Sequence, residues 1–330
     1  MTNTGFFVRE FPLVLAVITW TCLVLAIWFL LKHKNASWIF SSQSEKDRRQ
    51  TVAYKRGGLL LLLMGAAGFA PSLYIILTTG VVWSVNQQKP HIDVDAALWI
   101  HIVLTSIWLC LVGIQLLTGD KTSRRKTHRI NGRVVAFTAI VGTALAGGWV
   151  WTFIHDFSEG VDGPFFQAGI YTWIMGFGVA INTTLAVVYA RNRNFLLHKD
   201  YALMMLFWTF DPAVHRLWMW LMRLACWDCW EPQYTAGLGT VFAKLPANLF
   251  LVAWALIMCA YAGRLNKIIV ANVAVQYLFW VRGTYRVVVV SMGTVYAASI
   301  AGISLALGLA LLLTGQHASK KIASRFSNKV

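Results

Sequence analysis

The stretch YALMMLFWTFDPAVHRLWMWLM, residues 201–222, indicates the fold class most directly because it is long and apolar enough to cross a bilayer as one helix. Asp211 lies in the middle of this stretch, and His215 and Arg216 follow one helical turn later. A carboxylate that faces lipid at this depth costs roughly 3 kcal/mol or more. We therefore expect Asp211 to point into the protein, and it is the first candidate for a functional residue.

The composition of the whole chain also indicates a membrane protein. Of its 330 residues, 58% are hydrophobic and only 13% are charged, well below the roughly quarter-charged balance of soluble domains. The net charge of +16 comes from short basic blocks between apolar runs, where retention of Lys and Arg on the cytoplasmic side explains it. The sequence therefore predicts an integral membrane protein that does not bind nucleic acid.

Apolar runs of about 20 residues or more are long enough to cross the hydrocarbon core as helices. Such runs are residues 11–31, 58–84, 94–118, 134–154, 166–190, 201–225, 238–262 and 287–314. A shorter run, residues 268–281, is expected to be an interfacial or re-entrant helix, or else a ninth crossing. We expect an all-α, polytopic transmembrane helical bundle of eight spans, or nine, that forms a single domain over residues 1–330.

The charges of the loops predict the orientation of these spans. The basic loops are residues 32–57, 119–133 and 191–199, and the acidic loops are residues 156–165 and 226–236. Because basic loops stay in the cytoplasm, this alternation places the N-terminus outside. The second acidic loop contains Cys226 and Cys229, which could form a local disulfide if that side is oxidising.

Positions 204, 208, 211, 215, 218 and 222 recur at spacings of three and four, so they share one face of a helix. His101, in the third span, is expected at a depth comparable to that of His215, so that the two could meet. The candidate catalytic residues are Asp211, His215, Arg216 and His101. The expected lining of a substrate cavity is Trp208, Trp218, Trp173, Asn182 and Met204.

The polar residues also fit three roles besides catalysis. Asp211 could form a structural ion pair with Arg216 or Arg223. Neutral histidines are good axial iron ligands, so the chain could carry haem b and transfer electrons. The ligand pairs would then be His101 with His215 and His128 with His198. An aspartate and a histidine could also relay protons in a proton-coupled transporter.

Residues 95–225 contain three motifs, HIVLTSIWLCLVGIQLLTG from His101, RRKTHRINGRVVAF from Arg124 and LLHKDYALMMLFWTF from Leu196. This core resembles a widespread family of membrane proteins known as a domain of unknown function. Its pattern has a His opening one helix, a Gln near that helix's end, an HRxxGR box, and a later His box leading to an intramembrane Arg. The matching positions are His101, Gln115, His128, Arg129, Gly132, Arg133, His198 and Arg216. The resemblance implies a shared fold and assigns no reaction.

The DPxxHR segment at residues 211–216, with abundant Trp and Tyr, resembles fungal integral-membrane terpene cyclases of ascofuranone-type meroterpenoid pathways. The resemblance implies protonation of an epoxide or olefin on a farnesyl chain attached to an aromatic ring, followed by ring closure without a redox cofactor or metal. Asp211 would be the acid, His215 its proton partner or the final base, and Arg216 an orienting charge. It also implies a lipophilic substrate from the bilayer and a location in the endoplasmic reticulum membrane, and it leaves the oligomeric state open.

Overall fold

The computed structural model describes residues 43–79, 81–83, 91–93, 96–118, 125–155, 166–225, 247–258, 267–292, 294–295, 298–299 and 301–306. The first expected span, residues 11–31, and the Cys226 and Cys229 pair lie outside these ranges.

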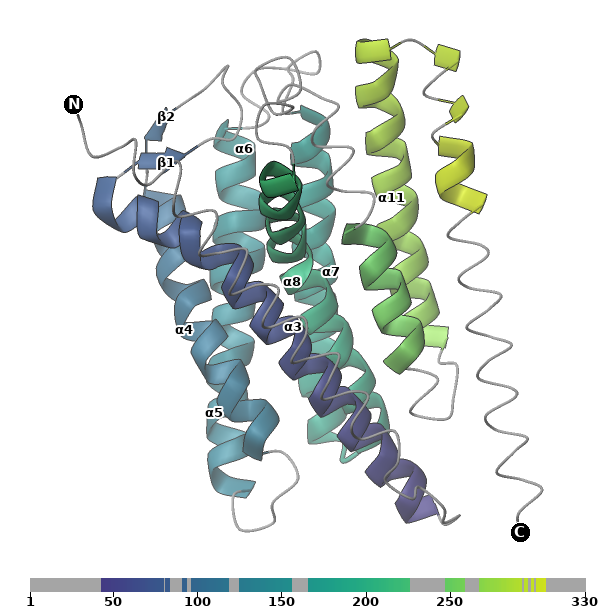
Figure 1. Cartoon of the computed structure of the whole chain (residues 1–330). Helices are drawn as coiled ribbons and strands as arrows, with labels where there is room; N and C mark the ends of the chain where they lie inside the picture. Colours follow the sequence, from purple (N-terminus) through teal and green to yellow (C-terminus); the bar gives the residue numbers. More distant parts are fainter. Residues whose placement is uncertain are drawn as a thin grey trace.

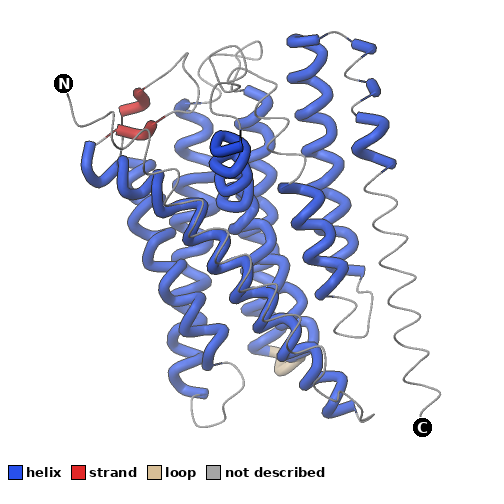
Figure 2. The backbone as a smooth tube through the Cα atoms, in the orientation of Figure 1, coloured by secondary structure: helices blue, strands red, loops and turns tan. Residues whose placement is uncertain are grey.

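The described residues are almost entirely helical (Figures 1 and 2). In chain order the elements are α3 (Gln43–Thr79), β1 (Val81–Trp83), β2 (His91–Asp93), α4 (Ala96–Thr118), α5 (Arg125–Thr138), the π-helix η3 (Ala139–Trp151), α6 (Thr152–His155), α7 (Phe166–Arg191), α8 (Phe195–Ala225) and α11 (Lys267–Met292). A further apolar helix, Ala247–Met258, precedes α11. The two short strands pair antiparallel, with Val82 opposite Ile92.

Within the described ranges, four helices are long and apolar enough to cross a membrane by length and composition. These are Gln50–Phe69, Ala96–Leu117, Lys126–Ile154 and Gly169–Arg191. On α4, a stripe of apolar side chains at spacings of three, four and seven residues is between 42% and 51% exposed: Ile100, Val103, Ile107, Ile114 and Leu117. A continuous exposed apolar stripe suits lipid rather than water. These features agree with an integral membrane protein, and the total of eight spans stays a prediction.

Three helices begin earlier than the hydrophobic pattern predicted. α3 begins at Gln43 rather than at residue 58, and α5 begins inside the expected loop 119–133. α8 begins at Phe195, inside the expected loop 191–199. The prediction was wrong at these ends because the backbone hydrogen bonds of a membrane helix continue into the polar layer, where hydropathy no longer reports them.

The region around α11 also differs from the prediction. The run 268–281 and the start of the expected span 287–314 belong to one continuous helix of 26 residues, Lys267–Met292. Arg282 separates the two apolar runs in the sequence, but an arginine side chain does not interrupt backbone hydrogen bonding. The second expected span, 58–84, is likewise shortened, since α3 ends at Thr79 and a strand follows.

Helix α8 packs against α3, α7 and α11, and α3 crosses the bundle obliquely (Figure 1). Glycines of α3 allow its backbone to approach α8 closely. A Cβ added at Gly65 would lie 2.3 Å from the Phe210 ring, and one at Gly68 would lie 2.1 Å from the carbonyl oxygen of Ala213. Small residues of this kind bring membrane helices into backbone contact.

The register of α4 against α8 follows from two contacts. A Cβ at Gly58 would meet both Leu116 of α4 and Leu206 of α8, so these residues lie at one level. At the next level Trp108 of α4 lies against Phe210 of α8, with 5.2 Å between ring centroids. Because the α4 number falls while the α8 number rises, the two helices are antiparallel.

A tight turn joins α7 to α8 and makes them neighbours. Arg193 adopts a φ of 58°, the left-handed region that side chains rarely occupy outside turns. Asn194 then caps α8, since its Oδ1 accepts a hydrogen bond of 3.3 Å from the backbone nitrogen of Leu197. This turn returns the chain along α7 and sets the face of α8 that α7 covers.

Candidate functional site

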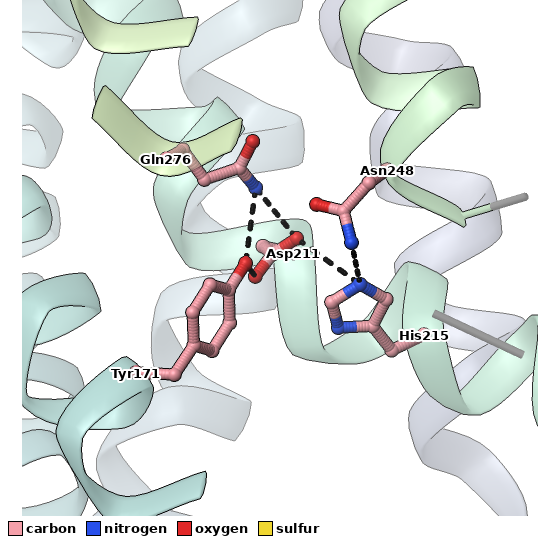
Figure 3. A network of polar contacts seen from close by, with 5 residues as sticks. All are labelled: Tyr171, Asp211, His215, Asn248 and Gln276. Carbon is pink, nitrogen blue, oxygen red and sulfur yellow. Dashed lines mark hydrogen bonds and ion pairs between the residues drawn. The ribbon is translucent and has the colours of Figure 1, made fainter. Parts of the chain in front are cut away.

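Asp211 is completely buried in α8 and bonds to side chains of two neighbouring helices (Figure 3). The Tyr171 hydroxyl of α7 donates to Asp211 Oδ2, and Gln276 Nε2 of α11 donates to Asp211 Oδ1 at 2.7 Å. Gln276 Nε2 also lies 3.3 Å from the Tyr171 hydroxyl. One carboxyl group therefore ties three helices together in the interior.

His215 lies one turn after Asp211 on the same face of α8. Its Nε2 is 3.7 Å from Asp211 Oδ1 and accepts a hydrogen bond of 2.9 Å from Asn248 Nδ2. With the amide in this orientation, Nε2 carries a lone pair, and the neutral imidazole holds its proton on Nδ1. The imidazole also faces Tyr171, with 6.1 Å between ring centroids. A base thus lies beside the buried acid.

The predicted shared face of α8 is confirmed. Its members Met204, Trp208, Asp211 and His215 are each exposed by 5% or less, and Trp218 packs against the same core. The alternative role of Asp211 in an ion pair with Arg216 is not observed, and the Arg216 guanidinium lies over the Phe69 ring instead, 5.2 Å from its centroid. The Arg223 side chain lies outside the described part of the chain.

A second polar group lies one turn away from Asp211 along α8. Asn182 Nδ2 of α7 and Trp208 Nε1 each donate to Asn272 Oδ1 of α11 at 2.7 Å. The Trp208 indole lies on Gly178, where a Cβ would be 2.3 Å from the ring. Asn182 and Trp208, both expected to line a cavity, are therefore near Asp211 and bonded to a common partner.

Trp173, also expected at the cavity, lies at a different interface. Its Nε1 donates to the Trp149 carbonyl at 3.3 Å, and Trp149 Nε1 donates to the Trp173 carbonyl at 3.2 Å. These reciprocal bonds join α7 to η3. Trp173 follows Tyr171 by two residues, about 200° around the helix, so its side chain points away from Asp211.

His101 does not meet His215 in this structure. Its Nδ1 donates to the Gly142 carbonyl of η3 at 2.8 Å and lies 3.3 Å from Thr105 Oγ1. The π-helical turn at Gly142 is of a rare type that is frequent at functional sites. The four candidate catalytic residues therefore separate into Asp211 with His215 on one side of α8, and His101 and Arg216 elsewhere.

The HRxxGR box lies in helix α5, so the expectation that His128 is in a loop was wrong. Asn131 Nδ2 donates to the Leu111 carbonyl at 2.8 Å and to Gln115 Oε1 at 2.9 Å. Gln115 Nε2 in turn donates to His128 Nε2 at 3.0 Å. A Cβ at Gly132 would lie 2.9 Å from Gln115 Nε2, so the glycine of the box leaves room for this network. The two arginines of the box, Arg129 and Arg133, are exposed.

His198 lies in the first turn of α8, outside the expected span. Its Nδ1 donates to the Ala186 carbonyl at 2.9 Å. Burial lowers the pKa of His198 below its usual value; the hydrogen bond to Ala186 opposes this effect, and the charge of Lys199 adds to it. His198 is therefore predominantly neutral near pH 7.

A second buried carboxylate joins α8 to α3 at the same end of the helix. Asp200 is 0% exposed, and its Oδ1 accepts hydrogen bonds from Gln50 Nε2 at 2.7 Å and from the Tyr54 hydroxyl at 2.9 Å. Asp200 precedes Asp211 by 11 residues, about 16 Å along the axis. Helix α8 therefore carries two buried aspartates, Asp200 in its second turn and Asp211 near its middle.

The sequence reasoning missed three residues of the site, Tyr171, Asn272 and Gln276. A signal for two of them is present in the run IIVANVAVQYLFWV, where Asn272 and Gln276 are one helical turn apart. Two amides on one face of an apolar helix predict polar partners on a neighbouring helix. Tyr171 carries no comparable signal, because a tyrosine in a membrane span is as often there for the packing of its ring as for a hydrogen bond of its hydroxyl.

No family model, curated protein or solved structure matches the chain. The geometry itself defines the class of site. An all-helical bundle with lipid-suited faces holds a buried carboxyl group, a tyrosine hydroxyl and an imidazole within one contact network. Groups of these three kinds exchange protons, and burial keeps bulk water from them.

Proposed function

We propose that this chain is a membrane-bound terpene cyclase that transfers a proton from Asp211 to a lipophilic substrate. The observation that carries the proposal is the complete burial of Asp211 beside Tyr171 and His215. The contact with Tyr171 serves both states of the acid. The tyrosine hydroxyl donates to the ionised carboxylate, and the protonated carboxyl donates to the tyrosine oxygen.

The reaction proposed is an isomerisation, so no oxidant or reductant is required. The Asp211 proton passes to the epoxide oxygen or olefin carbon of a farnesyl chain on an aromatic ring. The carbon–oxygen bond or double bond opens, and the resulting cation is captured by an internal double bond, which closes the ring. Nε2 of His215 then removes a proton from the cyclised cation, and those electrons form the new double bond.

The distance of 3.7 Å from His215 Nε2 to Asp211 Oδ1 completes the cycle. A proton that His215 has taken up returns across this gap to the ionised Asp211, which restores the starting state. The Asn248 amide must turn its oxygen toward Nε2 while the imidazole is protonated, because Nε2 then becomes a donor. Gln276 and Tyr171 hold the carboxyl group in position and are positioning residues.

Access to Asp211 requires a local opening, because the side chain has no exposed surface in this structure. The surrounding indoles and rings suit a cationic intermediate, since aromatic faces attract positive charge and exclude water. Trp208 is the nearest of the expected wall residues along α8. The polar group that it forms with Asn182 and Asn272 lies one turn from Asp211 along α8.

Microsomes that contain the protein, incubated with an epoxidised farnesyl phenol, test the proposal. We expect a product of unchanged mass and altered retention time, which Asp211→Asn abolishes. Asp200→Asn is the matched control, since it also neutralises a fully buried aspartate of α8 but lies about 16 Å away. Full activity in Asp211→Asn, with both variants inserted in the membrane to the same level, would exclude the aspartate as the acid.

A second candidate function, haem b binding, is favoured by His101 and His198. Each donates Nδ1–H to a backbone carbonyl, which leaves Nε2 directed elsewhere, as in histidines that bind iron. Their expected partners are differently placed, because Nε2 of His128 bonds to Gln115 and Nε2 of His215 bonds to Asn248. A Soret band in the visible spectrum of the purified protein would support this second function over the first.

A further inference from the structure

Arg216 is exposed on the protein surface and has no acidic partner among the described residues. Its guanidinium lies over the Phe69 ring of α3, 5.2 Å from the ring centroid. Arg216 follows Asp211, the middle of the apolar stretch 201–222, by five residues, about 8 Å along the axis, so it lies inside the apolar layer. An arginine without an acidic partner at this depth marks a place where an anionic group binds.

His101 also lies inside the apolar layer and is held in one tautomer. It is the sixth residue of the stretch Ala96–Leu117, about 8 Å from its end. Because the Gly142 carbonyl accepts Nδ1–H, the neutral ring keeps a lone pair on Nε2, which has no hydrogen-bond partner within the described ranges. A Cβ at Gly147 would lie 2.2 Å from His101 Nδ1, so this glycine makes room for the imidazole.

The register of α4 and α8 brings His101 and Arg216 to one level. Trp108 and Phe210 are in contact, and the helices are antiparallel. His101 lies two turns before Trp108 on α4, and Arg216 lies nearly two turns after Phe210 on α8. Because the helices are antiparallel, both steps lead in the same direction. Helix α3 packs against both α4 and α8 beside them.

We propose that Arg216 and His101 together bind the acidic head group of a lipophilic molecule that lies in the bilayer beside α3, α4 and α8. The guanidinium donates to one oxygen of the head group, and His101 Nε2 accepts the proton of a second oxygen. A carboxylic acid or a phosphate monoester offers both oxygens. The hydrogen bond between His101 and the head group forms in either protonation state. If the proton moves from the head group to Nε2, the imidazolium donates it back to the same oxygen. The exposed apolar side chains of α4, Ile100 and Val103 among them, suit the tail.

This head-group site is separate from the proposed catalytic site. Five residues separate Asp211 from Arg216, about 140° around the helix, so the two side chains leave α8 on different faces. Head-group binding therefore does not depend on cyclisation. Asp211→Asn should keep the head-group binding while losing any cyclisation. A variant that loses the head-group binding should, in turn, keep cyclisation.

Native mass spectrometry of the full chain in detergent micelles tests the site with three probes. These are oleic acid, methyl oleate, which lacks the acidic hydroxyl, and dioleoyl phosphatidic acid. We expect at least one acid to be retained at about 10-fold lower concentration than the ester, which corresponds to about 1.4 kcal/mol. Preference for oleic acid identifies a carboxylic acid site, and preference for phosphatidic acid identifies a lipid phosphate site. Equal retention of all three probes would overturn the proposal.

Variants then test which residues cause the preference for the acids over methyl oleate. Arg216→Gln should abolish it, whereas Arg133→Gln, which removes another exposed arginine, should leave it intact. Gly147→Ala retains both polar side chains but displaces the imidazole, so it should weaken the preference several-fold. Its control is Gly302→Ala, where an added Cβ meets nothing within 4 Å. Arg216→Lys keeps the charge and should retain part of the preference. An unchanged preference in Arg216→Gln would contradict the assignment.

Discussion

Gln276 and Asp211 are 65 residues apart in the sequence and are joined by a hydrogen bond of 2.7 Å from Gln276 Nε2 to Asp211 Oδ1. Both side chains are 0% exposed. Because Tyr171 binds the other carboxyl oxygen, the position of the acid is set by two helices other than its own. The orientation of this carboxyl group is therefore a property of the assembled bundle.

Gln276→Leu should destabilise the protein, because it leaves a buried oxygen of Asp211 without this donor. The expected cost is about 1–3 kcal/mol in the free energy of unfolding, measured by denaturation in mixed micelles. Asp211→Leu combined with Gln276→Leu should cost less than the sum of the two single variants, by about 1 kcal/mol. Strict additivity would show that the bond between the two side chains contributes nothing to stability.

Tyr171→Phe should slow the proposed cyclisation while the bundle stays folded. The phenyl ring retains the packing against His215, but the hydroxyl that holds Asp211 Oδ2 is lost. We expect a decrease of about 10-fold to 100-fold in the rate of product formation from the farnesyl epoxide. Tyr201→Phe, at a tyrosine stacked on Tyr189 away from the site, is the control and should be unaffected. Equal rates for the two variants would remove Tyr171 from the mechanism.

Gly68→Ala should lower the thermal stability of the protein. The new Cβ would lie 2.1 Å from the carbonyl oxygen of Ala213, and backbone atoms cannot move aside as a flexible side chain can. Overpacking of this kind costs about 1–3 kcal/mol, which a shift in Tm by differential scanning fluorimetry will detect. Gly302→Ala should leave Tm unchanged, because its Cβ would enter open space. Similar Tm values for both variants would mean that α3 and α8 are packed less closely.

The stability of the protein should fall as the pH decreases through the range of His198. Burial lowers the pKa of His198 in the folded state below the ordinary value of 6.5, so the unfolded state binds more protons in acid. The contribution of His198 to stability is thus present above about pH 6.5 and is lost as the pH falls below it. His198→Gln keeps a donor for the Ala186 carbonyl and should reduce the loss of stability between about pH 7.5 and about pH 5. Parallel curves of Tm against pH for wild type and variant would show that His198 does not cause the loss.

Much of the fold could be predicted from the pattern of apolar residues. Such runs predicted helices at α4 and α7 nearly to their observed ends, because a span must be about 20 residues long to cross the hydrocarbon layer. The same reasoning failed at α11, where Arg282 made one helix look like two segments. Hydropathy reports where a helix lies in lipid, whereas helix ends are set by backbone hydrogen bonds.

The order of amino acids alone was enough to predict which side chains share the buried face of α8, since Asp211 and His215 are one turn apart on any α-helix. It also predicted that a carboxylate in so apolar a stretch would face inward. The packed bundle was needed to establish that Tyr171 and Gln276 bind Asp211, that Arg216 lies over Phe69, and that His101 bonds to Gly142 of η3. Helical periodicity fixes neighbours within one helix, whereas partners across helices depend on rotation and register, which close packing of the whole bundle sets.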